Sequence, residues 1–358
     1  MKKSTLKYRT HININQYQMN KFLTLLLGFL LILSSCTDDE KDITANYTTG
    51  TFIVNEGPFM GGTGTITYYD GNNATQDVFE KENNGNVLGN IAQSMIKFSN
   101  QYFIAVNNAA KIQVVDAVNF KSAGEIKNIT LPRYFAATQN RLFVTSWAND
   151  FTTGFIHELD PLNLKVLTSK AINGLAERII ARDNFLFISI SSYSSSAFPR
   201  NVLVMDINTN TIVDTIQVGD NPSDLTFDKN GDIWVTCSGF TDYTDPALST
   251  LGSIHKISAR KSVFSYPISN GSKSIVADKK GENIYYISDE KVLEHNINSS
   301  SGADKTVIEG AFYSIGYNKQ SEELFLGEKE FQKPGKIEVQ LPLTGRIPKK
   351  FRVLVYGL

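Results

Sequence analysis

Short runs of alternating apolar and polar residues recur from about residue 48 to the end of the chain. Strict alternation over a few residues is typical of a β-strand with one buried face. The clearest runs share one course, in which an aliphatic residue, any residue and two apolar residues are followed by Asp: Ile66–Asp70, Ile112–Asp116, Ile156–Asp160 and Val202–Asp206. Degenerate copies follow at Ile254–Ser258, Val292–Asn296 and Ile337–Leu341. Neighbouring copies start 38 to 52 residues apart, which indicates a repeat architecture.

Residues 201–237 show the repeat most completely. Four short strands are predicted there, separated by turns rich in Asn, Gly, Asp and Pro, at 201–206, 212–218, 224–228 and 233–237. We interpret such a unit of roughly 45 residues as one blade of a β-propeller. Seven copies predict an all-β fold with almost no helix, a seven-bladed β-propeller of four-stranded antiparallel blades over residues 48–358. A β-sandwich is the alternative, but it does not predict a period of this length.

The first blade has no predicted innermost strand. Thr51–Asn55 reads as a second strand, whereas Phe351–Leu358 reads as the outer strand of the last blade. A propeller usually closes by taking the missing innermost strand from the C-terminus. Either that closing strand is missing here, or the register predicted for the last blade is wrong.

The N-terminal segment predicts export. Met19–Lys21 precedes twelve apolar residues, Phe22–Leu33. Twelve residues are too few to cross a bilayer as a helix, which needs about 20, but they match the apolar core of a signal peptide. The run ends in Leu33-Ser34-Ser35-Cys36, which resembles a bacterial lipobox, in which the Cys is acylated and begins the mature protein. We therefore predict a lipoprotein signal peptide at residues 1–35, with residues 1–18 interpreted as untranslated, and lipidation at Cys36.

An acidic stretch, Asp38–Asp42, follows the predicted lipidation site. It resembles the surface-export signal of Bacteroidota lipoproteins. We expect residues 36–47 to be a tether, and the protein to be lipid-anchored in the outer membrane and to face the extracellular side. The alternative is a solvated tether on a protein that faces the periplasm. In both cases acyl chains hold the protein without a membrane-spanning segment.

The charge balance and the cysteine content of the chain exclude several classes of function. The chain has 35 basic and 36 acidic residues and a net charge of −1, which gives no reason to expect a nucleic-acid partner. Its two cysteines, Cys36 and Cys237, form no CxxC motif or Cys/His cluster, so zinc-ribbon and thioredoxin-like sites are excluded. With Cys36 acylated, no intrachain disulfide can form.

Two sets of loops are predicted to form the ligand-binding face. The first set joins the outer strand of one blade to the inner strand of the next and places a polar, partly aromatic ring of side chains at the mouth of the central channel. Arg supplies planar multidentate hydrogen bonds and Tyr a ring face with a polar tip, so a polar organic ligand is predicted. The predicted ligand-binding residues of this set are Gln93, Arg133, Tyr134, Glu177, Arg178, Asp224, Lys273, Phe312 and Tyr313.

The second set joins the second and third strands and is long in five blades, each time with an aromatic residue. Aromatic rings in exposed loops indicate a contact surface. Alternatively, the rings hold the long loops against the blade edge. Trp147, Tyr193 and Tyr243 are the predicted ligand contacts from this set, with Trp147 as the first choice.

Catalysis has little support, and we expect no enzyme activity, cofactor or metal site. His157 and His255 occupy equivalent strand positions two blades apart and His295 another register, so they cannot converge on a metal ion. No nucleophile elbow for Ser-His-Asp chemistry occurs. The enzymatic alternative is a metal-dependent lactonase of the gluconolactonase type, because the segments around Glu56, Asn173 and Asp224 superficially resemble its oxygen-ligand motifs.

Two segments resemble a known family. Asn201–Gly239 resembles the YVTN/YncE-type propeller repeat, and Thr51–Gly57 with Tyr68–Asp70 resembles the opening of Bacteroidota surface lipoproteins of this group. The BtuG-type members capture vitamin B12 for a TonB-dependent transporter. The resemblance implies non-enzymatic binding of a small ligand, with a corrinoid as the named candidate, and delivery to such a transporter. A protein-interaction scaffold at the cell surface is the alternative from another class.

Overall fold

The computed structural model describes residues 46–58, 61–192, 198–300 and 304–328, and the backbone of 336–340 and 349–352. The predicted signal peptide, the lipidation site Cys36 and Tyr193 lie outside the described residues. Among the residues that are described, no helix combines the length and the apolar character needed to cross a membrane.

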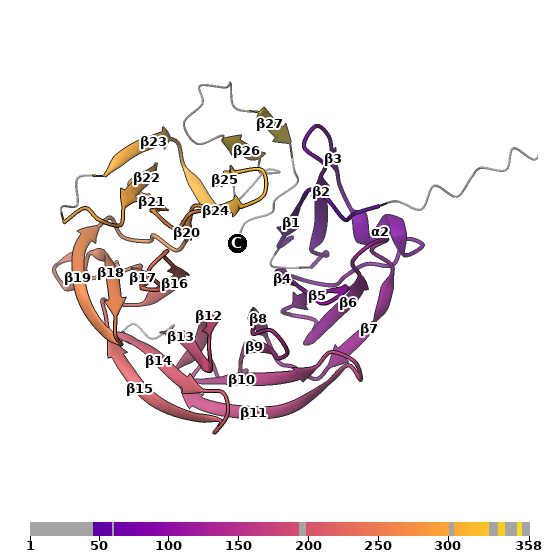
Figure 1. The fold of residues 1–358 in the computed structure, drawn as a ribbon, viewed down its shortest axis with the longest axis horizontal. Helices are drawn as coiled ribbons and strands as arrows, with labels where there is room; N and C mark the ends of the chain where they lie inside the picture. The colour runs from indigo at the N-terminus through magenta and orange to yellow at the C-terminus, as the bar shows by residue number, and fades with distance from the viewer. Residues whose placement is uncertain are drawn as a thin grey trace, which may run out of the picture. The chain divides into compact units, whose positions relative to one another are not determined.

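Seven antiparallel sheets stand around a central axis in the described part of the chain (Figure 1). The first sheet has three strands, β1 (Thr51–Asn55), β2 (Thr65–Tyr69) and β3 (Ala74–Thr75). A short helix, α2 (Val78–Glu82), follows it, and a 3₁₀ turn, η1 (Pro246–Leu248), lies in a later loop. The other six sheets have four strands each.

These six sheets follow one another in chain order, and each begins at its strand nearest the axis. Their strands are β4 (Ala92–Phe98), β5 (Gln101–Val106), β6 (Lys111–Asp116), β7 (Ser122–Lys127); β8 (Pro132–Ala137), β9 (Leu142–Trp147), β10 (Thr153–Asp160), β11 (Lys165–Asn173); β12 (Leu175–Arg182), β13 (Phe185–Ser191), β14 (Asn201–Asp206), β15 (Thr211–Gln217); β16 (Pro222–Phe227), β17 (Ile233–Cys237), β18 (Gly252–Ser258), β19 (Lys261–Ile268); β20 (Ile275–Ala277), β21 (Asn283–Ser288), β22 (Lys291–Asn296), β23 (Lys305–Glu309); β24 (Phe312–Asn318), β25 (Glu323–Glu328), β26 (Lys336–Gln340), β27 (Lys349–Arg352).

The fold is therefore an all-β propeller with four-stranded antiparallel blades, as predicted. The prediction that every blade has four strands is not met in the first sheet, because no described strand pairs with the inner edge of β1.

The prediction that residues 201–237 form a single blade is wrong. The sequence pattern predicts one blade over these residues, but β14 and β15 belong to one sheet and β16 and β17 to the next. The sequence repeat and the blade are thus offset by two strands.

The Asp that ends the repeated strand motif starts a turn. In Asp116, Asp160 and Asp206 the carboxylate oxygen Oδ1 accepts hydrogen bonds from the backbone N–H groups two and three residues further on, at 2.8–3.1 Å. Asp70 makes the same pair of bonds at 2.7 Å. A short acceptor side chain that bonds its own following backbone is an Asx turn. The motif thus encodes the hairpin between the third and fourth strands of a blade.

The hydrophobic core lies between neighbouring sheets. One cluster joins Val202 and Val204 of β14 to Leu225 of β16 and Val235 of β17.

The core also includes Tyr47, which the sequence pattern predicts to lie in the tether. Its side chain is buried, its N–H donates to the carbonyl of Val118 at 2.8 Å, and its ring packs 5.9 Å from that of Phe120. The folded part therefore begins at or before this residue.

Candidate functional site

The inner strands carry a β-bulge at the position of the predicted ring. In five of them the pairing register shifts within the first residues, and the shift leaves one or two residues out of the ladder. A bulge turns side chains away from the regular alternation and is common beside binding sites. The residues left out are Gln93, Arg133 with Tyr134, Glu177 with Arg178, Ser223, and Tyr313.

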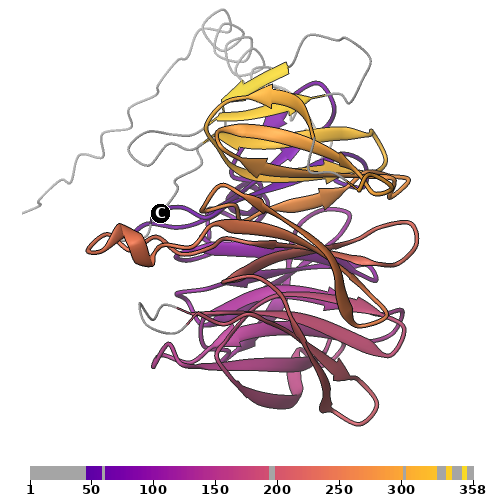
Figure 2. The same cartoon turned by 90° about the vertical axis from the view of Figure 1, so that its left-hand side faces the viewer.

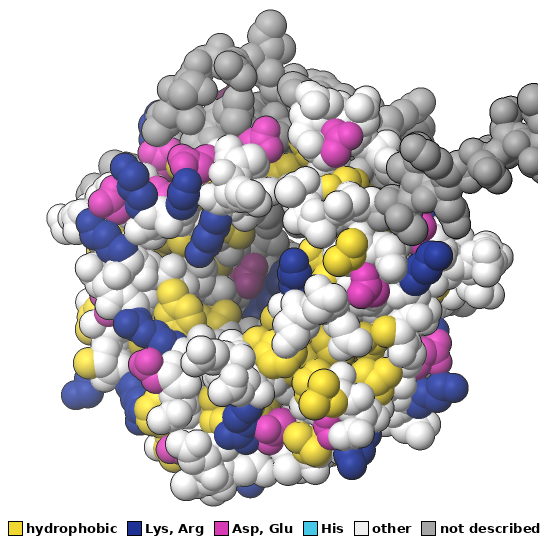
Figure 3. All heavy atoms as spheres, turned by 45° about the vertical axis from the view of Figure 1, so that its right-hand side comes forward, with side chains coloured by type: hydrophobic (Ala, Val, Ile, Leu, Met, Phe, Trp, Pro, Cys, Tyr) yellow, Lys and Arg dark blue, Asp and Glu magenta, His cyan; other side chains and the backbone are white. Residues whose placement is uncertain are grey.

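A cavity of about 400 Å³ lies where these bulges meet, and we call it the mouth cavity. The centre of the ring is visible as a hollow in Figure 3, with acidic and basic side chains in it. Seven predicted residues line the mouth cavity: Gln93, Arg133, Tyr134, Glu177, Arg178, Lys273 and Tyr313. The repeat therefore predicted half of the lining of a cavity whose residues come from strands far apart in sequence.

Two arginines of the mouth cavity each stack on an aromatic ring. The Arg133 guanidinium makes a bidentate pair with Glu177, with Nε–Oε2 at 2.9 Å and Nη2–Oε1 at 2.6 Å. It lies 4.1 Å from the centre of the Trp147 ring, and Arg178 lies 3.7 Å from the centre of the Tyr134 ring. Bidentate pairing and stacking both fix the plane of a guanidinium. The site is thus held in shape before any ligand arrives.

Glu56 also lines the mouth cavity, although the sequence predicts it only as a metal ligand of the enzymatic alternative. Its carboxylate accepts long hydrogen bonds from Gln93 at 3.4 Å and from the Tyr313 hydroxyl at 3.5 Å. Burial raises the pKa of Glu56, and the positive charge of Arg133 opposes that rise. Glu56 was missed as a binding residue because it directly follows β1, at the start of a loop of the second set, from which only aromatic residues were predicted as ligand contacts.

Lys273 is the exposed cation of the site. It lines the mouth cavity and also a smaller neighbouring cavity of about 190 Å³ that Trp147 helps to form. Its side chain makes no hydrogen bond or ion pair with another described residue. Arg133 and Arg178 are paired with Glu177 and Asp224, whereas the positive charge of Lys273 acts on Glu56 from a distance and helps to limit the rise of its pKa.

Trp147 and Asp224 do not line the mouth cavity themselves but contact the two arginines that line it. The Trp147 side chain is buried and its indole N–H donates to the carbonyl of Ala176 at 2.8 Å, so it is chiefly a platform for Arg133. Asp224 is buried and lies outside the mouth cavity lining. It accepts bonds from the backbone N–H groups of Leu225 and Ile275 and pairs with Arg178 at 3.3 Å. Burial raises the pKa of Asp224, and Arg178 opposes the rise.

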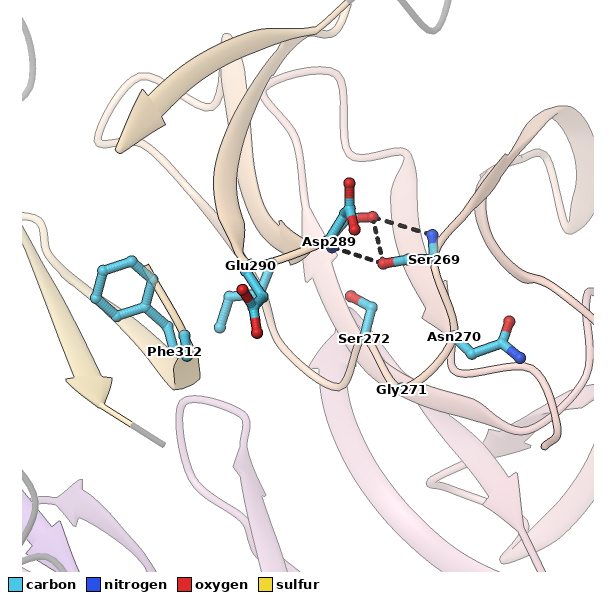
Figure 4. Close-up of a pocket in the computed structure, with 10 residues that line it drawn as sticks. Ser269, Asn270, Gly271, Ser272, Asp289, Glu290 and Phe312 are labelled. Atoms are coloured by element: carbon cyan, nitrogen blue, oxygen red, sulfur yellow. Dashed lines mark hydrogen bonds between the residues drawn. The ribbon is translucent and has the colours of Figure 1, made fainter. Parts of the chain in front are cut away.

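Phe312 and Tyr243 do not lie in the mouth cavity. Phe312 is buried in the core between two sheets, because the bulge in β24 turns Tyr313 rather than Phe312 toward the axis. Its ring borders a separate polar pocket of about 240 Å³ beside Ser272 and Glu290 (Figure 4). Tyr243 is 92% exposed in the loop between β17 and β18.

The residues of the enzymatic alternative are scattered. Asn173 ends the outer strand β11, Asp224 is paired with Arg178, and Glu56 lines the mouth cavity. His157 is held within its own sheet, whereas the His295 ring packs against Trp234 and Tyr266 of the neighbouring sheet. His157 bonds the hydroxyls of Ser146 and Ser169, each at 2.8 Å, and burial lowers its pKa to about 4.

The fold and the mouth cavity define the class of the protein, a β-propeller with a polar, charged channel mouth. A family model described as a domain of unknown function, DUF5074, matches residues 49–329, and the chain belongs to this family. No curated protein matches the chain significantly.

Solved structures share the fold. A candidate 6-phosphogluconolactonase from Bacteroides fragilis NCTC 9343 is 9% identical, with a TM-score of 0.61 over 90% of this chain and 98% of that chain. The Dos1 propeller is 12% identical, with a TM-score of 0.56 over 87% of each chain. Apo AztD from Citrobacter koseri is 13% identical, with a TM-score of 0.50 over 84% of this chain and 94% of that one. At these identities the likeness concerns the fold alone.

Proposed function

We propose that the protein binds a small anionic organic ligand in the mouth cavity and does not transform it. The observation that carries this proposal is the convergence of bulged side chains from several sheets on one cavity of about 400 Å³. That volume lies in the range of small-molecule sites, and a few polar groups in fixed positions set specificity in such sites. We count the three-stranded sheet as the first of seven blades.

The chemistry of the cavity favours a planar ligand with a carboxylate or a phosphate. Lys273 offers an ammonium group that no described carboxylate neutralises directly. The guanidinium groups of Arg133 and Arg178, each held flat by the aromatic ring it stacks on, offer planar faces to such a ligand. Glu56 and Gln93 add acceptors and donors beside Arg133 and Tyr134, to which the Gln93 amide is hydrogen-bonded.

The resemblance to YVTN/YncE-type lipoproteins supports the cellular setting of the proposal. In that setting Cys36 anchors the protein in the outer membrane, facing the extracellular side, and the bound molecule passes to a TonB-dependent transporter. A corrinoid is the named ligand from the BtuG-type resemblance. It is larger than the mouth cavity, so it would lie across the mouth and insert only a part of itself.

Ligand titration tests the proposal. Cyanocobalamin, nicotinate and phenyl phosphate are first compared by thermal shift, and a probe that raises the melting temperature is then titrated by calorimetry. We expect Lys273→Ala to weaken binding of the anionic probe about tenfold, since one charge contact is lost. Lys280→Ala is the matched control, because Lys280 is also exposed but does not line either cavity.

Equal affinities for the Lys273→Ala variant and the unaltered protein would remove Lys273 from the site. Absence of any stabilisation by all three probes would contradict the ligand class. Calcium-dependent hydrolysis of a lactone by the unaltered protein would replace the binder with the enzymatic alternative.

A scaffold function is favoured by one observation. The segment between β17 and β18, with the turn η1, stands out from the ring at the left of Figure 2. Tyr243, Leu248 and Leu251 in this segment are 92%, 61% and 66% exposed. Apolar side chains gathered on one exposed loop are typical of a protein contact surface. Copurification with another outer-membrane protein that is lost in a Tyr243→Ser, Leu248→Ser variant would support this function.

A further inference from the structure

A polar pocket of about 240 Å³ lies beside the mouth cavity, and we call it the acidic pocket. It is bounded by the connection from β19 to β20, by the turn between β21 and β22, and by the start of β24 (Figure 4). Ser272 and Phe312 line the acidic pocket, whereas the next residues along the chain, Lys273 and Tyr313, line the mouth cavity. The two cavities share no lining residue, so the acidic pocket is a separate place for a ligand.

A two-residue turn forms one side of the acidic pocket. Only Asp289 and Glu290 connect β21 to β22, with φ of 51° and 54°. Positive φ at both central residues is the pattern of a type I′ hairpin, in which Asn-Gly, Asp-Gly and Gly-Gly are preferred. Glu290 stands at the position that Gly usually takes. The turn therefore carries a carboxylate that its backbone does not require.

The side chains that line the acidic pocket supply negative charge without a matching cation. The carboxylates of Asp289 and Glu290 are exposed and form no hydrogen bond or ion pair with another described residue. None of the described residues that line the pocket is Lys, Arg or His. The side-chain amide of Asn270 already donates to the Phe240 carbonyl at 3.3 Å and to the Thr241 hydroxyl at 3.4 Å. Since carboxylates only accept hydrogen bonds, the pocket has acceptors in excess of side-chain donors.

A buried hydroxyl without a partner lies in the same pocket. Ser272 is 4% exposed, and its Oγ forms no hydrogen bond with a described residue. In Figure 4 this hydroxyl is directed toward the turn that carries Asp289 and Glu290. The Ser269 hydroxyl, in contrast, accepts a bond from the Asp289 N–H at 2.6 Å and shares a bond with the Ser288 hydroxyl at 2.8 Å. Because buried polar groups are nearly always paired, Ser272 indicates a bound partner.

We propose that the acidic pocket binds an organic cation through an ammonium or guanidinium group. An ammonium group has three N–H donors, a guanidinium group has five, and neither has an acceptor, which matches the excess of acceptors in the pocket. Charge-assisted hydrogen bonds to carboxylates are stronger than bonds between neutral groups. Ile287 and Phe312 add an apolar side for the methylene groups that carry such a cation. A metal ion fits less well, because the described part of the chain has no cluster of three His, Cys, Asp or Glu side chains that could hold one.

Calorimetric titration with butylguanidine tests the proposal. We expect the Glu290→Gly variant to bind about tenfold more weakly than the unaltered protein, since one charge-assisted contact is lost. Glycine suits the left-handed backbone at this position, so the variant keeps the turn. Glu322→Gly is the matched control, because Glu322 is also exposed, has φ of 57° and does not line the pocket. Equal affinities of the two variants, or no binding to the unaltered protein at millimolar concentration, would overturn the proposal.

The Ser272→Ala variant separates binding from folding. Its hydroxyl has no described partner, so the variant should keep the melting temperature of the ligand-free protein and bind butylguanidine more weakly. A lower melting temperature with unchanged affinity would assign Ser272 a structural role and overturn the proposal. Equally tight binding of butylurea, which has the same shape without the charge, would also overturn it.

A blocked Gly-Arg-Gly peptide distinguishes the two sources of such a cation. Tighter binding of the peptide than of butylguanidine would support an Arg or Lys side chain of a protein partner. Weaker binding of the peptide would support a free small cation. Because the acidic pocket and the mouth cavity share no lining residue, these outcomes are independent of the titrations with anionic ligands.

Discussion

Individual side chains of this propeller have different roles, which depend on their burial and on their partners. Arg133 and Arg178 are paired and stacked, so their role is to fix the shape of the mouth cavity. Lys273 lines the same cavity, makes no ion pair with a described residue and acts on Glu56 only through its charge. His157 is buried within its own sheet and bonded to two serines. Burial disfavours a charged imidazole, which makes His157 a contributor to pH dependence rather than to binding.

The free energy of unfolding should fall as the pH falls from about 6.5 to about 4 partly because of His157. Its pKa is lowered to about 4 in the folded protein from an ordinary value of 6.5. In this window the unfolded chain binds a proton that the folded protein does not bind, so acid favours unfolding by up to roughly 3 kcal/mol. Urea unfolding at several pH values should show a flatter profile for His157→Gln. Parallel profiles for the two proteins would contradict this role.

At the scale of the element, the sequence pattern predicted strands better than blades. Alternation and turn residues placed β14 and β17 at the bounds that the structure has, and β15 and β16 within one or two residues. The pattern could not assign these strands to sheets, because pairing depends on which hairpins pack together in space. For the same reason Tyr313, and not Phe312, reaches the axis: the bulge that decides this is a property of the paired strands.

The turn between β10 and β11 should depend on Asp160. Its carboxylate accepts bonds from the N–H groups of Leu162 and Asn163, each at 3.0 Å, and from the Asn163 side chain at 2.8 Å. The bonds from Asn163 lower the pKa of Asp160. Asp160→Ala should therefore lower the melting temperature in calorimetry, because the acceptor is lost. Asp160→Asn keeps an acceptor and should melt at a higher temperature than the alanine variant, and equal melting of both would disprove the turn's contribution.

At the scale of the whole molecule, the ring brings distant repeats to one mouth. Seven of the twelve predicted ligand contacts line the mouth cavity, because equivalent positions of a closed repeat face the same axis. Glu56 escaped prediction because it follows the second strand of the first sheet, whereas the ring of contacts was predicted from the loops before the inner strands of the other blades. Tyr243 could not be placed, since its loop has no counterpart of the same length in other repeats.

Cys237 offers a measure of the integrity of the whole ring. It is fully buried in the core between two sheets, and burial raises the pKa of its thiol to about 12. Because the thiolate is the reactive form, we expect no alkylation of Cys237 by iodoacetamide at pH 8 in the folded protein and complete alkylation in urea. Mass spectrometry of the peptide that contains Cys237 provides the measurement. Rapid alkylation without denaturant would indicate that the sheets separate readily.

The two-strand offset between sequence repeat and sheet determines how this circle can grow or shrink during evolution. Each repeat contributes its first two strands to one wedge and its last two to the adjoining wedge, as residues 201–237 do. Duplication or loss of one repeat in the gene would therefore add or remove a complete wedge and leave no unfinished one. The same event would add or remove one bulge at the axis, so the circumference of the circle and the composition of its opening would change together.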